Sequence, residues 1–182
     1  QESKANMIKD RTTAYAKLVV SGKKIAGRKE YLACKRHLDD LKNKKLEYKF
    51  DVEEAEFAIN FANTLTLKDG TNLKTRGFQD FIIGSLHGWK KKRTKERRFR
   101  EAYLQVGRRN GKSFLSGAES TMFSTLLGNK DRIFCAATKQ DQANIVWDEI
   151  RNFIESDNDL SELYKIKEHD RTIKSLATGT VI

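Results

Sequence analysis

One segment near the middle of the chain constrains the fold more than any other. A short apolar run, residues 102–106, leads directly into a loop that ends in Gly111-Lys112-Ser113, and residues 114–127 then have the pattern of a helix. A phosphate-binding P-loop requires this order of strand, loop and helix. Backbone amides of such a loop surround the phosphates, and the start of the helix adds a favourable dipole. The sequence therefore predicts a nucleotide site at residues 107–113.

The residue types in the loop suggest separate roles. Lys112 is expected to reach the β- and γ-phosphates as a point charge, and the Ser113 hydroxyl to complete the ligand shell of a Mg²⁺ ion. The loop departs from the usual G-x-x-x-x-G-K-[ST] pattern, because Val106 stands at the first glycine position and Gly107 follows it. Arg108 and Arg109 also lie in the loop. An arginine there could neutralise charge at the γ-phosphate, or both side chains could point to solvent or pair with surface acids, and position alone leaves these open.

The charge of the chain indicates a polyanionic partner. The formal net charge is +11 at pH 7, and cations that contact a nucleic-acid backbone release condensed counterions. The densest basic run is residues 90–100, which either contacts the DNA backbone or is a solvated loop.

No run of about 18 apolar residues exists, so we expect no membrane span. Two distant cysteines suit a reducing cytoplasm.

The pattern along the chain predicts an α/β fold. Helices are expected at residues 3–20, 28–45, from Asp51 to about residue 65, 78–86, 114–127 and 139–155, and strands at 102–106, 132–137, 164–167 and 172–176. The rhythm of strand and helix favours the parallel sheet of a P-loop NTPase, preceded by an all-helical N-terminal segment. We place a domain boundary in the loop 68–72, so that residues 1–70 form the helical segment and 71–182 the N-terminal part of the ATPase domain.

A possible second nucleotide motif lies at residues 145–149, Ile-Val-Trp-Asp-Glu. An apolar run that ends in Asp-Glu is typical of a Walker B strand, but the flanking apolar positions follow helical spacing, which favours an amphipathic helix. No other segment supplies such acids. The ATPase core is therefore expected to stop before its catalytic carboxylates.

Several segments in this order resemble the large terminase subunit of tailed bacteriophages, the ATPase that pumps DNA into procapsids. The matching residues are 32–41, 78–83, 88–89, 100–103, 108–113 and 136–143. The most specific of them are the loop Arg108-Arg-Asn-Gly-Lys-Ser113 and the string Ala136-Ala-Thr-Lys-Gln-Asp-Gln-Ala143. The family has an atypical Walker A loop that lacks the first glycine and begins with an arginine, and Val106 and Arg108 match that departure.

The resemblance implies roles for particular residues. It implies that Arg108 acts in cis as an arginine finger, that Lys112 contacts the phosphates, and that Gln79 recognises adenine beside Phe78. The full set of expected ATP-binding residues is Phe78, Gln79, Gly107, Arg108, Arg109, Asn110, Gly111, Lys112 and Ser113, with Arg108 and Lys112 catalytic and Ser113 holding Mg²⁺. The family's Walker B pair and its C-terminal nuclease domain find no match in this sequence.

The resemblance also implies a setting for the chain. It implies translocation of double-stranded DNA coupled to ATP hydrolysis by a homo-oligomeric ring, with the small terminase subunit and the portal protein as partners, in the cytoplasm of a bacterial host. A subunit without the catalytic acids is expected to bind ATP and barely turn it over. Two alternatives stay open: another P-loop nucleic-acid motor or helicase, and a non-catalytic DNA-binding assembly module with a vestigial loop.

Overall fold

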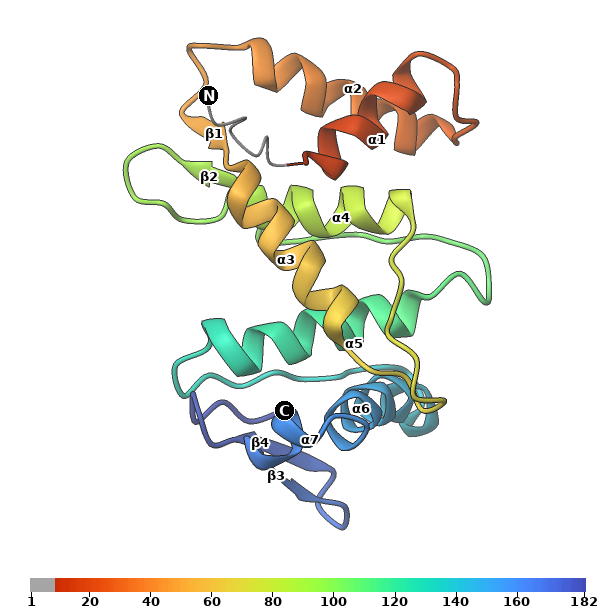
Figure 1. The fold of residues 1–182 in the computed structure, drawn as a ribbon, viewed down its shortest axis with the longest axis vertical. Helices are drawn as coiled ribbons and strands as arrows, with labels where there is room; N and C mark the ends of the chain where they lie inside the picture. The colour runs from red at the N-terminus through yellow and green to blue at the C-terminus, as the bar shows by residue number, and fades with distance from the viewer. Residues whose placement is uncertain (1–8) are drawn as a thin grey trace, which may run out of the picture. The chain divides into compact units, whose positions relative to one another are not determined.

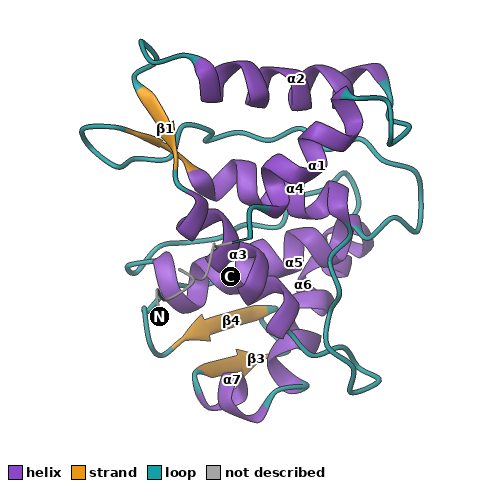
Figure 2. Cartoon of the chain, turned by 45° about the horizontal axis from the view of Figure 1, so that its top comes forward, coloured by secondary structure: helices purple, strands orange, loops and turns teal. Residues whose placement is uncertain are grey.

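The computed structural model describes residues 9–182, which divide into two compact units (Figures 1 and 2). Of the described residues, the first unit comprises 9–60 and 75–103, and the second comprises 61–74 and 104–182. Each unit is therefore discontinuous in sequence, and helix α3 (Val52–Thr64) contributes residues to both. The predicted division into a helical segment, residues 1–70, and the N-terminal part of an ATPase domain, residues 71–182, stays a prediction.

The first unit is built around three helices, α1 (Arg11–Val20), α2 (Arg28–Lys42) and α4 (Gly77–Gly88). The Asp10 carboxylate accepts a hydrogen bond of 2.8 Å from the amide of Thr13, so α1 begins at Arg11. The sequence predicted a helix from residue 3. Residues 9 and 10 are not helical, so the prediction is wrong there, and residues 3–8 lie outside the described part of the chain. Helix α1 packs against both α2 and α4. The core between them contains Tyr15, Ala16, Val19, Cys34 and Phe81.

Two short strands complete the first unit. Strand β1 (Tyr48–Phe50) pairs antiparallel with β2 (Trp89–Lys91), and Phe50 lies opposite Trp89. The prediction of an all-helical N-terminal segment is therefore wrong. A strand of three residues has too little periodicity to be recognised, and its partner lies about 40 residues further along the chain.

The second unit contains most of the C-terminal half. Helix α5 (Lys112–Met122) continues as a turn of π-helix, η1 (Phe123–Leu127), and is followed by α6 (Gln140–Glu155) and α7 (Asn158–Glu162). Strands β3 (Tyr164–Lys167) and β4 (Thr172–Ser175) form an antiparallel hairpin. The predicted helices and hairpin strands are thus confirmed. The core contains Trp147, Ile150, Ile154, Tyr164, Ile173 and Ile182.

Of the predicted parallel sheet, the described residues form one isolated parallel bridge. Arg132 pairs in parallel with Val181, and the amide of Ile133 donates 2.8 Å to the carbonyl of Val181. Residues 102–106 form no strand with the described residues, and Phe134, within the predicted buried strand 132–137, is 80% exposed. A parallel strand becomes buried only when helices and further strands from distant segments cover it. The fold is therefore a mixed helix and strand architecture, and a complete parallel sheet is not confirmed within residues 9–182.

Within residues 9–182, no helix has both the length and the apolar character needed to cross a membrane.

Candidate nucleotide-binding site

The backbone of the loop 107–111 turns sharply before α5 begins. Arg109 has φ +62° and Gly111 has φ +73°, so both lie in the left-handed region. A glycine adopts this conformation at no steric cost, but a non-glycine residue such as Arg109 is strained there by about 1 kcal/mol or more. Strain of this kind is concentrated at functional loops.

Helix α5 begins with no side-chain cap. Gly111 is its N-cap residue, and the first helical bond runs from the amide of Leu115 to the carbonyl of Gly111, at 2.9 Å. The first amide groups of a helix have no partner within the helix, and here no side chain replaces one. Together with the positive end of the helix dipole, these amides favour an anion at the start of α5.

The charges of the loop are all positive. The ammonium of Lys112 folds back over the loop and donates to the carbonyls of Val106, at 3.1 Å, and Gly107, at 3.4 Å. Arg108 and Arg109 are exposed, and neither forms an ion pair with residues 9–182. Since no acidic residue lies between 107 and 113, the loop presents three uncompensated cations to an anionic ligand.

One side chain holds the turn together. The amide nitrogen of Asn110 donates to the carbonyl of Gly107, at 3.2 Å, and to the carbonyl of Arg108, at 3.1 Å. Ser113 is half-buried in the first turn of α5. The structure thus brings together the predicted residues from Gly107 to Ser113 on one loop and one helix end.

Close packing fixes the helix that carries the loop. The Phe114 and Phe153 rings lie 6.2 Å apart, and a Cβ at Gly117 would lie 3.1 Å from Cε2 of Phe153, so α5 and α6 approach closely. At the other end, the Tyr164 hydroxyl is hydrogen-bonded to the hydroxyls of Ser124, at 2.7 Å, and Thr125, at 2.6 Å. The lysine and serine are therefore presented by a helix that is anchored along its length.

Gln79 has a structural role that the sequence reasoning missed. It lies in the first turn of α4, is buried, and its Oε1 accepts 2.8 Å from the amide of Arg76, so it caps its own helix. Phe78 packs against the core of the first unit. A glutamine at the third position of a helix is a known capping signal. Because both residues belong to the first unit, their role toward adenine stays a prediction.

The Asp-Glu pair of residues 148 and 149 belongs to α6, as the periodicity predicted. Arg171 lies 3.3 Å from the Asp148 carboxylate, and burial raises the pKa of the Glu149 carboxyl. Neither acid follows a strand. The structure therefore confirms the amphipathic helix and not the Walker B reading of this segment.

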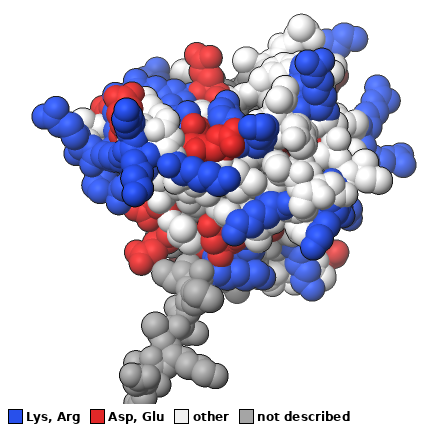
Figure 3. All heavy atoms as spheres, turned by 90° about the horizontal axis from the view of Figure 1, so that it is seen from above, with Lys and Arg blue, Asp and Glu red and all other residues white. Residues whose placement is uncertain are grey.

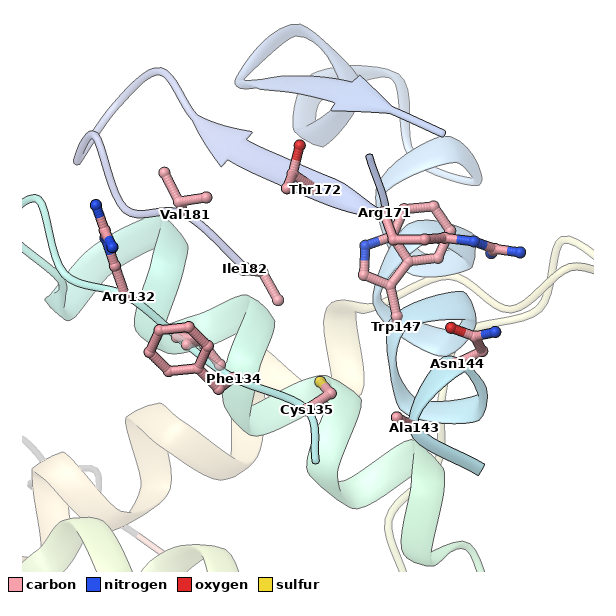
Figure 4. Close-up of a pocket in the computed structure, with 11 residues that line it drawn as sticks. Arg132, Phe134, Cys135, Ala143, Asn144, Trp147, Arg171, Thr172, Val181 and Ile182 are labelled. Carbon is pink, nitrogen blue, oxygen red and sulfur yellow. The ribbon is translucent and has the colours of Figure 1, made fainter. Parts of the chain in front are cut away.

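A separate pocket of about 370 Å³ lies in the second unit (Figure 4). Residues 132–135 line it, with the α6 side chains Asn144 and Trp147 across from them and Val181 near the C-terminus. Arg171 stacks on the Trp147 ring, 4.9 Å from its centroid. None of the residues 107–113 lines this pocket, so it is distinct from the candidate nucleotide site.

The chain was compared with known proteins. The profile of the family described as terminase large subunit, ATPase domain, matches residues 77–182. The crystal structure of the HK97 bacteriophage large terminase is similar in fold, with a TM-score of 0.61 and 19% sequence identity over 70% of this chain. The chain spans about a quarter of that protein, since the match covers 26% of it. No curated protein sequence matches the chain. The family profile covers more than half of the residues and includes the loop 107–113, so the chain belongs to the family of terminase large subunit ATPase domains.

Proposed function

We propose that this chain binds ATP with Mg²⁺ at the loop 107–113 and forms part of the ATPase motor that packages viral DNA. The observation that carries the proposal is the uncapped start of α5 behind a loop with three cations and no acid. Such a site suits a ligand with several negative charges in a row, which a triphosphate provides. Membership in the terminase ATPase family supports the same ligand.

Each loop residue has a proposed part in binding. The backbone amides from Asn110 to Ser113 would surround the phosphates, and Lys112 would exchange its carbonyl partners for phosphate oxygens, which are stronger acceptors because they are charged. Arg108, exposed and without an ion pair among the described residues, is proposed as the arginine that contacts the γ-phosphate. Arg109 adds positive charge at the mouth of the loop.

The Ser113 hydroxyl would hold the metal. The donor set fits, because hydroxyl, water and phosphate oxygens are the ligands Mg²⁺ prefers and Ser113 lies directly after the phosphate-binding lysine. A bound Mg²⁺ would neutralise charge on the β- and γ-phosphates. Gln79 and Phe78 are proposed to recognise adenine, in addition to the capping bond that Gln79 makes.

The motor setting is also part of the proposal. In keeping with the family resemblance, we propose double-stranded DNA as the substrate of translocation, like subunits in a ring, the small terminase subunit and the portal protein as further partners, and the host cytoplasm as the location. The match to about a quarter of a large terminase supports this chain as one portion of such a motor.

Calorimetric titration with a non-hydrolysable ATP analogue and Mg²⁺ tests the site. We expect the 182-residue chain to bind, and Lys112→Ala to weaken binding about ten- to a hundredfold, the value of a hydrogen bond to a charged group. Lys167→Ala is the matched control, because Lys167 is an exposed lysine of the same unit that lies outside the loop. It should leave the affinity unchanged.

Two outcomes would contradict the proposal. If neither the parent chain nor the control binds the analogue, the loop is not a nucleotide site in this chain, and a DNA-binding module becomes the better description. If Lys112→Ala and Lys167→Ala weaken binding equally, the affinity for the analogue depends only on the net charge of the chain and not on the loop.

A further inference from the structure

The basic run is an ordered hairpin and not a solvated coil. The segment after β2 folds back along that strand. The amide of Lys91 donates 2.9 Å to the carbonyl of Glu96, Lys90 pairs with Arg97, and the amide of Arg98 donates 2.9 Å to the carbonyl of Trp89. We call residues 89–98 the basic hairpin. It also contacts the loop before β1, because the amide of Lys92 donates 2.9 Å to the carbonyl of Glu47.

Arg98 fixes this hairpin to the rest of the first unit. Its guanidinium lies 2.7 Å from the Asp40 carboxylate and is stacked over the rings of Tyr48, Trp89 and Phe99 at 5.0 to 5.1 Å from their centroids. Both charged side chains are only 17% exposed. A partly buried ion pair with three cation–π contacts holds a hairpin far more firmly than an exposed pair does.

The cations at the tip are left unneutralised. Two of the acids beside these cations are already paired, Glu54 with Lys90 and Glu96 with Lys91. Five exposed cations on and beside the hairpin form no salt bridge with residues 9–182: Lys92, Arg93 and Lys95 of the hairpin, and Lys44 and Lys45 of the loop before β1. We call these five the tip cations. Figure 3 shows lysine and arginine side chains gathered on the left, the side on which β1 and β2 lie in Figure 1.

The crowding of positive charge affects the pKa of one lysine in the hairpin. The Lys49 ammonium beside Lys95 lowers the pKa of that lysine, with Lys90 adding to the effect. Repelling cations held on a fixed backbone store a free energy that a polyanion would release.

From this arrangement we propose that the tip cations, on the basic hairpin and the adjoining loop before β1, form a contact surface for the phosphate backbone of double-stranded DNA. The choice of duplex follows from the aromatic rings. Single strands are bound by exposed aromatic side chains on which bases stack, but Trp89 is 2% exposed and the rings of Tyr48 and Phe99 lie under Arg98. Charge without stacking fits backbone contact, which is independent of sequence. The proposal rests on the proposed DNA-packaging function, for which it names a contact surface.

Fluorescence anisotropy with a labelled duplex of arbitrary sequence tests the surface. The test variant carries Lys92→Gln, Arg93→Gln and Lys95→Gln. The control carries Lys17→Gln, Lys23→Gln and Lys24→Gln, which removes the same charge from exposed lysines at the end of α1. We expect the test variant to lose about ten- to a hundredfold in affinity near 0.1 M salt, and its slope of log K against log salt to become shallower by about 2 to 3. The control should change little.

Any of three results would overturn the proposal: no binding of duplex by the parent chain, equal weakening by the two triple variants, or tighter binding of a single strand of the same length than of the duplex. Circular dichroism checks that both variants are folded. Binding of the ATP analogue separates this proposal from the nucleotide site, because the hairpin variant should bind the analogue normally and Lys112→Ala should bind DNA normally.

Discussion

His37 is a buried histidine whose surroundings favour the neutral ring. It is 3% exposed, its Nδ1 accepts 3.0 Å from the indole of Trp89, and its Nε2 lies 2.9 Å from the Thr13 hydroxyl. With Nδ1 as acceptor, Nε2 carries the proton and donates to Thr13. Burial lowers the pKa of His37 from 6.5 to about 4, although Asp10 and Asp40 oppose the shift.

This shift predicts that the first unit is destabilised by acid. Because the pKa is lower in the folded chain, the unfolded chain takes up the proton first, so stability should fall as the pH drops below about 6.5 and level off below about 4. The total loss is on the order of 3 kcal/mol. Urea unfolding between pH 7.5 and pH 4 measures it.

Two variants identify the histidine that is responsible. His37→Gln should be less stable at pH 7 but should lose less stability on acidification. His169→Gln should behave like the parent chain, because His169 is fully exposed. An unchanged pH dependence in His37→Gln would show that another group causes the acid sensitivity.

At the scale of elements, the contact between α1 and α4 depends on a missing side chain. A Cβ at Gly84 would overlap with the hydroxyl of Thr12 and lie 3.3 Å from Cδ1 of Ile59. Thr12 is fully buried, and its hydroxyl has no hydrogen-bond partner among the described residues. The close approach of the helices therefore requires glycine at this position.

We expect Gly84→Ala to destabilise the chain by about 1–3 kcal/mol, although alanine is the better helix former. Thr12→Ala alone should cost about 1 kcal/mol, because it removes a buried methyl group, while the hydroxyl it also removes has no partner. The double variant should be more stable than Gly84→Ala, since the overlapping oxygen is gone. Thermal unfolding of the four proteins measures this coupling, and purely additive effects would contradict it.

At the scale of the whole molecule, the prediction concerns turnover. The acids at 148 and 149 lie on α6, one paired with Arg171, and no carboxylate lies in the loop 107–113. We therefore expect this chain to bind the ATP analogue while its release of phosphate from ATP stays near background. Phosphate release with time, compared between the parent chain and Lys112→Ala, checks this. A rate well above background that Lys112→Ala abolishes would show that other residues of the chain supply the catalytic acid.

Local patterns were sufficient for much of the second unit. The glycine and lysine of the loop, the helix that follows it and the helical spacing across residues 140–155 are determined by neighbours within one or two turns, and the structure has them as predicted. The pairing of β1 with β2 and the ordering of the basic hairpin depend on Asp40 and Tyr48, some 50 residues before Arg98, and no local signal reveals such a contact.

Residue types at fixed short spacings were enough to recognise the loop 107–113, its positive charge and the family to which the chain belongs. Tertiary structure decided which segments become strands, since an extended segment becomes a strand only when a partner supplies its hydrogen bonds, and the partners of residues 102–106 and 132–137 cannot be read from those residues. It also decided that Gln79 caps its own helix and that His37 is neutral, because both results depend on what surrounds a side chain and not on its position in the sequence.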